Sequence, residues 1–313
     1  MLHLVGRRVL MAIPLLLIVS ILSFVLASLA PGSVAASILG TGATPQEVQR
    51  VNLELGLNRP VLVQYWDWLS NAIHGNLGVS LFSGEPVTSL IASRMTVTLS
   101  LAVVTLIVSV VLGVGFGAFS AIRGGFAARA ADALSVVFMS VPSFWLATVL
   151  LTLFAVNIRL FPVSGFVPLT VSPTQWVSSL FLPVVALTAG AMATIALNTR
   201  GEILHALRSD FVRSLRANGI PAWRTLFIHV LRNAAAPLLP VIGLLFVALL
   251  GGTVLMESIF GMGGLGALAQ QATTQHDLPV IQGIVVVYTI AVVIVFLVLD
   301  VATAYVNPKV VIS

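Results

Sequence analysis

The chain contains 313 residues, of which 58% are hydrophobic and 8% are charged. A soluble domain carries about a quarter charged residues, so this composition excludes a globular protein with a fully water-exposed surface and indicates a membrane protein. The formal net charge is +5, and the sequence has no cysteine, which excludes disulfide frameworks, thiolate metal sites and cysteine nucleophiles.

Six uncharged stretches are long enough to cross a bilayer as helices, since the hydrocarbon core needs about 20 apolar residues. They are residues 9–29, 95–122, 133–158, 179–199, 233–256 and 278–299. These runs are continuously apolar and lack the alternation of barrel strands, so we expect an all-α membrane protein with six transmembrane helices. The first run is longer than the apolar part of a signal peptide, which favours an uncleaved span over the alternative of a removed leader.

The placement of basic residues predicts the orientation of these spans. Six spans put both termini on one side, together with eleven of the fifteen basic residues: Arg7, Arg8, Arg123, Arg129, Arg200, Arg208, Arg213, Arg216, Arg224, Arg232 and Lys309. The other four fall on the opposite side: Arg50, Arg59, Arg94 and Arg159. By the positive-inside rule, both termini are expected in the cytoplasm.

The spans divide the chain into parts with different expected locations. The expected parts are the N-terminus and first span at 1–30, an extracytoplasmic subdomain at 31–94, the core of spans two to six at 95–306 with a cytoplasmic loop at 200–232, and a cytoplasmic tail at 307–313. Within the outer segment, Thr44, Pro45 and Glu47 match a helix start, with Thr44 as the cap and Glu47 at the third helical position.

The cytoplasmic loop at 200–232 carries six arginines, whose insertion into the bilayer would cost roughly 15–20 kcal/mol. Four apolar residues recur there at helical spacing: Leu204, Leu207, Phe211 and Leu215. Asn218 and Gly219 followed by Pro221 predict a helix stop, after which Pro221 opens a second helix that leads into the fifth span. The pattern predicts a short amphipathic helix and a sharp turn, and a helix lying on anionic lipid fits it equally well.

This loop also carries a family resemblance. The stretch Asp210–Pro221, read with His229–Leu238, resembles the EAA loop of ATP-binding-cassette (ABC) importer permeases, most closely in the dipeptide/oligopeptide/nickel branch. Further motifs of that branch occur in order along the chain, at Ala30–Gly32, Leu55–Pro60, Gly75–Ser80, Val141–Trp145, Leu160–Gly165, Glu257–Phe260 and Val301–Pro308. The chain departs from the generic Glu-Ala-Ala wording, because Arg213, Ser214 and Leu215 stand in those places.

The resemblance implies that residues 211–221 form a coupling helix, which lodges in a cleft of a cytoplasmic ATPase subunit. The coupling residues it implies are Phe211, Val212 and Leu215 as apolar contacts, Arg213 and Arg216 as a polar rim, and Gly219, Ile220 and Pro221 at the turn. It implies four kinds of protein or solute partner: a second homologous permease, two ATPase subunits or domains that carry ATP and Mg, an extracytoplasmic solute-binding protein, and a peptide substrate. A nickel chelate or another small solute is the alternative cargo within the same branch.

The sequence shows no catalytic machinery. A P-loop needs a lysine after glycine, and the chain's one lysine is Lys309, so ATP hydrolysis is expected on separate subunits. Gly261–Gly266 formally matches a dinucleotide-binding motif but follows no predicted strand, and we interpret it as a tight loop. The five histidines lack metal-ligand spacing, so neither a metal site nor a directly bound cofactor is expected, and no nucleic-acid partner either.

Two groups of residues are weaker candidates. Those for lining a translocation path are Ser140, Pro142, Ser143 and Asn198, although single polar residues in spans more often bond a nearby helix. Pro142 also predicts a kink in the third span. The candidates for docking the binding protein are Glu257, Phe260 and Asp277, with an exposed carboxylate at a helix end as the alternative for Glu257.

Two other classes of protein remain open at this point. An ion-gradient-driven secondary transporter typically has ionisable groups near the bilayer midplane, and the six spans contain no Asp, Glu, Lys or Arg. A membrane scaffold without transport activity is harder to exclude from sequence. The permease interpretation rests mainly on the loop at 200–232.

Overall fold

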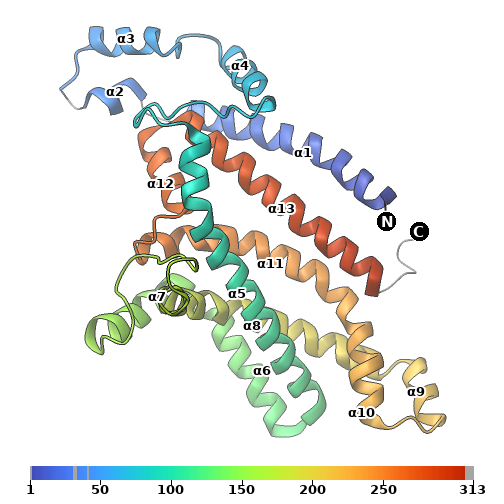
Figure 1. Cartoon of the computed structure of the whole chain (residues 1–313). Helices are drawn as coiled ribbons and strands as arrows, with labels where there is room; N and C mark the ends of the chain where they lie inside the picture. Colours follow the sequence, from blue (N-terminus) through green and yellow to red (C-terminus); the bar gives the residue numbers. More distant parts are fainter. Residues whose placement is uncertain (1, 31–33, 41, 307–313) are drawn as a thin grey trace. The chain divides into compact units, whose positions relative to one another are not determined.

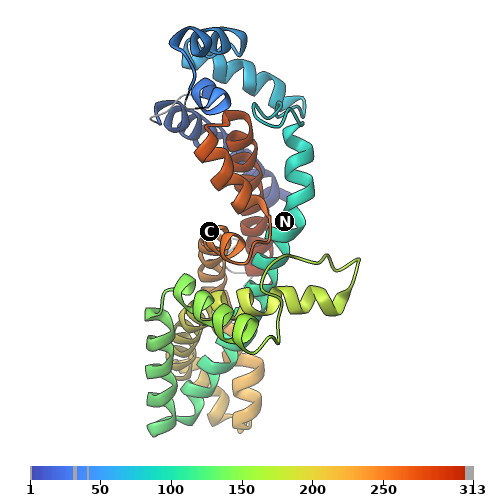
Figure 2. The same ribbon diagram turned by 90° about the vertical axis from the view of Figure 1, so that its left-hand side faces the viewer.

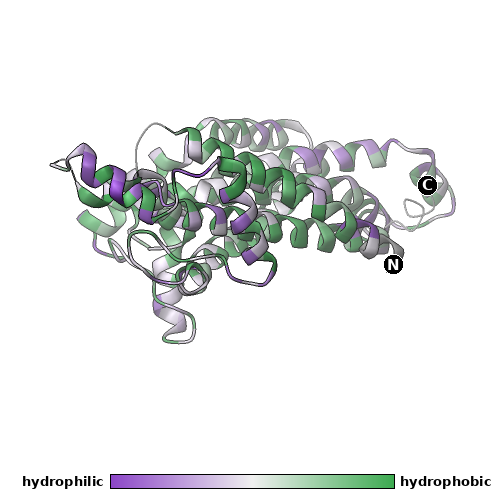
Figure 3. Ribbon diagram, turned by 90° about the horizontal axis from the view of Figure 1, so that it is seen from above, coloured by the Kyte–Doolittle hydropathy of each residue, from purple (hydrophilic) through white to green (hydrophobic). Residues whose placement is uncertain are grey.

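The computed structural model describes residues 2–30, 34–40 and 42–306. The expected tail at 307–313 lies outside these residues. The described chain is helical, and the β-type pairing found within it is an isolated bridge between Val79 and Pro86. Figure 1 shows the helices in chain order, and Figure 3 shows that the long ones are hydrophobic along most of their length.

The helices fall into two compact units, with boundaries inside the long helices α5 and α13. Unit 1 combines residues 1–98 and 262–293, and unit 2 combines residues 99–261 and 294–313. The helices up to α5 are α1 (Leu2–Leu29), α2 (Val34–Leu39), α3 (Pro45–Glu54), α4 (Val61–Ile73) and α5 (Val87–Arg123). The helices that follow are α6 (Gly125–Ser140), α7 (Ser143–Leu150), α8 (Pro173–Leu207), α9 (Asp210–Ala217), α10 (Ala222–Arg224), α11 (Leu231–Ile259), α12 (Leu265–Gln275) and α13 (Leu278–Val306), with π-helical turns η1 (Leu151–Asn157) and η2 (Thr225–Val230).

Five helices of the described chain have the length and apolar composition to cross a membrane. They are Gly6–Leu29, Val87–Arg123, Pro173–Leu207, Ala222–Ile259 and Leu278–Tyr305. The expected third span, residues 133–158, is not one helix: α6 and the segment Ser143–Asn157 meet at an angle of 91°. Counted as one bent span, this pair makes the sixth.

The break has a physical cause at Pro142. Proline lacks an N–H and disfavours helical geometry in the residue before it. Val141 is accordingly extended, with φ −81° and ψ 121°, and Pro142 caps the start of α7. The kink predicted at this proline is therefore present, but it separates two helices instead of bending one.

Unit 1 has a core shared by distant parts of the sequence. Val87 and Ile91 of α5 pack with Leu265 and Leu268 of α12 and with Val280 of α13. The outer segment 31–94 therefore does not build its core alone, because α12 and α13 complete it.

The helix start predicted at Thr44 in the outer segment is confirmed. The Thr44 and Glu47 side chains cap each other's backbone N–H, and the hydrogen bond from the Thr44 backbone N–H lowers the pKa of Glu47.

Unit 2 is built around α8, the most buried of the long helices. Helices α6, α7 and α11 all pack on it, as can be followed in Figure 2. Glycines bring α5 close to it as well: a Cβ placed on Gly113 would lie 2.7 Å from the Cβ of Ile195, and one on Gly117 would lie 2.4 Å from the Ala196 carbonyl oxygen. These two glycines therefore face α8 directly, whereas Gly115 faces open space.

Candidate functional site: the coupling segment

The segment between α8 and α11 contains the predicted short helix and its predicted stop. Helix α9 begins at Asp210 and ends at Ala217. The backbone N–H of Gly219 donates to Arg216 O at 3.0 Å, and that of Ile220 donates to Leu215 O at 3.1 Å. This pair of bonds is the Schellman ending, which needs a left-handed residue, and Gly219 has φ +74°. Pro221 then caps the start of α10.

The residues of α9 and of the turn that follows it divide into an inner and an outer set. Val212 is fully buried, in a cluster with Ile203 and Ala206 of α8, Val230 of η2 and Ala234 of α11. The outer set is exposed or half-buried and comprises Phe211, Arg213, Leu215, Arg216, Gly219, Ile220 and Pro221.

The assignment of Val212 as a contact for a partner is therefore wrong. The four-residue spacing of the other apolar residues drew attention to Phe211 and Leu215, but Val212 is the residue that faces inward. Its burial attaches α9 to the ends of α8 and α11. Phe211, with 37% of its surface exposed, and half-buried Leu215 remain the apolar residues that α9 presents outward.

The charges of α9 follow the helix dipole. Asp210 lies in the first turn and Arg216 in the last, which is the favourable order for both signs. Arg213 forms a surface ion pair with Asp210 at 3.4 Å, and 78% of its side chain is exposed. An exposed pair of this kind is weak, so the guanidinium is available to a partner. Chemically, the arrangement can dock into a groove and transmit force, and it has no group placed for catalysis.

Two of the four path candidates are bonded within their own helices. The Ser140 hydroxyl donates to Val136 O at 2.8 Å, and the Asn198 amide donates to Thr194 O at 2.8 Å. Both residues are exposed, as is Pro142, while Ser143 is half-buried. Their role in lining a path stays a prediction.

The three docking candidates are buried, so the expectation that they form an outer contact surface is wrong. Glu257, Phe260 and Asp277 have 0%, 3% and 2% of their surface exposed. Asp277 accepts a hydrogen bond from the Ser80 hydroxyl at 2.6 Å and one from the Leu81 N–H at 3.4 Å, and so holds a turn of unit 1 in place. These residues were chosen in the sequence because they lie near the ends of spans, and that position does not determine whether a side chain is buried.

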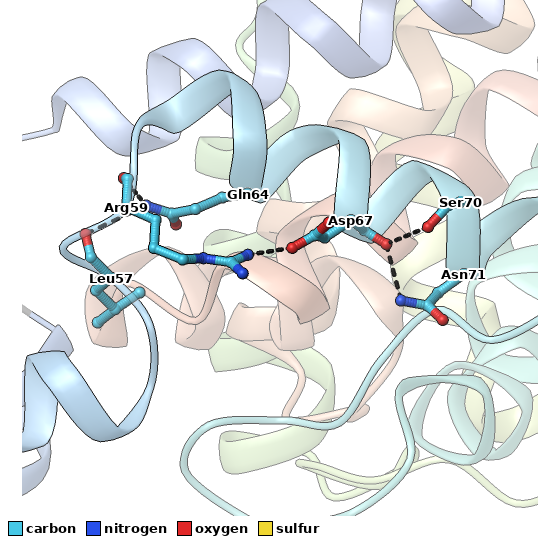
Figure 4. Close-up of polar contacts among 6 residues, drawn as sticks. All are labelled: Leu57, Arg59, Gln64, Asp67, Ser70 and Asn71. Carbon is cyan, nitrogen blue, oxygen red and sulfur yellow. Dashed lines mark hydrogen bonds and ion pairs between the residues drawn. The ribbon is translucent and has the colours of Figure 1, made fainter.

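Exposed polar groups on the outer segment lie instead around α4, as Figure 4 shows. The Gln64 amide donates to Arg59 O at 2.8 Å, and Arg59 forms an ion pair with Asp67. The Asp67 carbonyl accepts from Ser70 at 2.9 Å and from Asn71 at 2.8 Å. This network ties the entry of α4 at Arg59 to the middle of the helix and adds side-chain bonds in its last turns.

One polar cluster was missed in the sequence. In unit 2, Arg200 Nε of α8 lies 3.2 Å from Asp132 Oδ2 of α6, and the Ser120 hydroxyl of α5 donates to Asp132 Oδ1 at 2.8 Å. The available signal was that Asp132 and Arg200 have opposite charges and flank the inner ends of two consecutive predicted spans. No group of three or more metal-ligating side chains occurs among the described residues.

Comparison with known families supplies the class of protein. Residues 113–312 match the model of the binding-protein-dependent transport system inner membrane component, and residues 1–102 match the N-terminal domain of such membrane components. The chain belongs to this family, which confirms the resemblance seen in the loop: it is a membrane permease of a binding-protein-dependent ABC importer, and the gradient-driven alternative is set aside.

Individual relatives cover nearly the whole chain. A probable peptide ABC transporter permease of Sinorhizobium fredii is 39% identical over 305 residues, covering 97% of each chain. A putative peptide transport system permease of Brucella abortus is 38% identical, covering 98% of each. The glutathione transport system permease GsiC of Escherichia coli is 35% identical, covering 99% of each.

The fold also has a counterpart among solved structures. Inward-facing structures of the MetNI methionine ABC transporter contain a chain that aligns with TM-scores of 0.54 and 0.57. The alignments cover 70% of this chain and 97% and 96% of the other, at 19% and 20% identity. At this identity the likeness supports the permease fold alone.

Proposed function

We propose that this permease moves peptides across the bacterial inner membrane by alternating access, driven by ATP hydrolysis on separate cytoplasmic subunits. A second homologous permease completes the path, and a solute-binding protein delivers cargo from outside. Both termini lie in the cytoplasm, on the same side as α9. The observation that carries the proposal is the geometry of α9, a helix held by buried Val212 and ended by Gly219, with Phe211 and Arg213 facing outward.

Peptides are the cargo best supported by the relatives. Two are named as peptide permeases and one as a glutathione permease, and glutathione is itself a tripeptide. These similarities extend over almost the entire chain, including the outer segment as well as the spans. Nickel chelates remain the competing cargo of the same branch.

Labelling of single cysteines tests the orientation and docking of α9, because the chain has no cysteine of its own. Arg213→Cys places a thiol on the exposed face of α9, and Leu53→Cys, at a residue 62% exposed on α3, is the matched outer control. In right-side-out vesicles, an impermeant maleimide should label Leu53→Cys and leave Arg213→Cys unlabelled. In inverted vesicles, Arg213→Cys should label, and bound ATPase subunits should protect it.

Two outcomes would contradict the proposal. Labelling of Arg213→Cys from the outer side would reverse the orientation. If α9 lies on lipid instead of in a cleft of the ATPase, its labelling rate in inverted vesicles should be the same with and without the ATPase subunits.

A further inference from the structure

Asp132, Arg200 and Ser120 connect three helices at one level of unit 2. Asp132 uses both carboxylate oxygens, one toward the Arg200 guanidinium at 3.2 Å and one toward the Ser120 hydroxyl at 2.8 Å. Ser120 is 3% exposed, and the side chains of Arg200 and Asp132 are 35% and 26% exposed. The three helices involved are α5, α6 and α8.

Stability is a poor explanation for this cluster. Partly burying two charges costs about as much desolvation free energy as their attraction returns, and a well-packed apolar pair often does as well. What this ion pair adds is a preference for one register, because the charges of Arg200 and Asp132 attract each other across 3.2 Å only when the two residues lie opposite, although no hydrogen bond joins Arg200 Nε to the carboxylate. The buried face of α6 otherwise carries small residues such as Ala128 and Ala131, which pack closely but define the register weakly.

The cluster lies directly beside the coupling segment. Close packing of α5 on α8 reaches the same turn, since a Cβ on Gly117 would lie 3.1 Å from the Arg200 backbone nitrogen. One turn further along α8, Ile203 enters the apolar cluster that holds Val212 of α9. A continuous set of contacts therefore runs from α9 through α8 to Asp132 of α6.

Helix α6 packs along α8, and the ion pair adds a charged contact to that packing. Helix α6 joins α5 through Gly124 and Gly125, both with positive φ, at 63° and 62°. Two consecutive glycines of this kind constrain the direction of α6 relative to α5 only weakly. At its other end, α6 leads to the break at Pro142 and so to α7.

We propose that the Arg200–Asp132 ion pair is a positioning element of transport: it makes α6 follow α8, so that movement of α9 reaches the broken helix pair α6–α7. The inference rests on the coupling role proposed for α9. Arg200 and Asp132 act through the helices they join and do not contact substrate. Ser120 orients the carboxylate.

Charge variants in the assembled, reconstituted transporter test this role. Arg200→Gln and Asp132→Asn should each lower the amount of substrate transported per ATP hydrolysed by about tenfold, the size of a coupling of moderate strength. The exchanged pair Arg200→Asp with Asp132→Arg should recover most of it. Arg208→Gln, on an exposed arginine of the same loop, is the matched control and should keep the parental ratio.

The ratio of substrate transported to ATP hydrolysed distinguishes a positioning role of the ion pair from a purely structural one. If the pair served stability alone, the variants would lower transport and ATP hydrolysis together, in proportion to the amount of assembled protein. An unchanged ratio in Arg200→Gln would overturn the proposal, as would a lowered ratio that the exchanged pair does not restore.

A distance measurement in the absence of nucleotide tests whether the Arg200–Asp132 ion pair holds α6 in place on α8. Spin labels at Arg129→Cys on α6 and His205→Cys on α8 occupy exposed positions. The distribution of distances between the two labels should be narrow in the parent and broad in Arg200→Gln. Equal widths would refute the positioning role of the ion pair. This readout distinguishes the two proposals, because failure of ATP to drive transport in the parent would remove the proposed function and leave the distance result standing.

Discussion

Gly219 shows how one residue shapes the segment between α8 and α11. Its φ of +74° lies in the left-handed region, where a side chain costs about 1–2 kcal/mol. The Schellman bonds that end α9 need this conformation, and they place Ile220 and Pro221 at the sharp turn. Val212 makes the complementary contribution, because its burial attaches the helix that Gly219 ends.

Substitution of alanine at two glycines of this region should have opposite effects. Gly219→Ala should lower the free energy of unfolding by about 1–2 kcal/mol and reduce uptake, while the chain still inserts into membranes. Gly201→Ala, in α8 with no atom near its added Cβ, should be neutral or stabilising by up to about 1 kcal/mol. Thermal unfolding of the purified variants measures both, and equal stability and uptake for the two would refute the assigned turn.

At the scale of elements, the contact of α5 with α8 depends on a pair of glycines four residues apart. Small residues at this spacing let two helix backbones approach closely in a membrane. Gly113 and Gly117 face Ile195 and Ala196 of α8, while Gly115 between them faces open space. The three glycines therefore offer a test with an internal control.

Adding one methyl group should separate their roles. Gly117→Ala would place its Cβ 2.4 Å from the Ala196 carbonyl oxygen, so α5 must move away from α8. Overpacking of this kind costs about 1–3 kcal/mol, whereas Gly115→Ala should be neutral or slightly stabilising. A melting temperature for Gly117→Ala equal to that of Gly115→Ala would contradict this packing.

The elements also show what the sequence could predict. The composition and length of the apolar stretches located every long apolar helix. The helix-stop residues Asn218, Gly219 and Pro221 located the end of α9. Both signals are local in the sequence. The inward direction of Val212 and the burial of Glu257 and Asp277 were not predictable, since they depend on which distant helix packs there. The break at Pro142 was foreseen as a kink, but its angle is set by tertiary packing.

At the scale of the whole molecule, the family and the fold agree on a permease that contributes part of a transporter. Unit 2 contains the α8-centred bundle and the coupling segment, and unit 1 contains the outer segment with its shared core. The chain's one lysine, Lys309, lies in no P-loop motif, and the proposed function therefore assigns ATP hydrolysis to separate subunits. The central claim is that the energy of this hydrolysis enters through α9.

Uptake by proteoliposomes tests that claim most directly. The vesicles would contain this chain with its second permease and ATPase subunits, and the binding protein and labelled di- or tripeptides would be added outside. We predict peptide accumulation that requires hydrolysable ATP on the side of α9 and persists when ionophores collapse the ion gradients. Accumulation by this chain alone, driven by an ion gradient without ATP, would contradict the account.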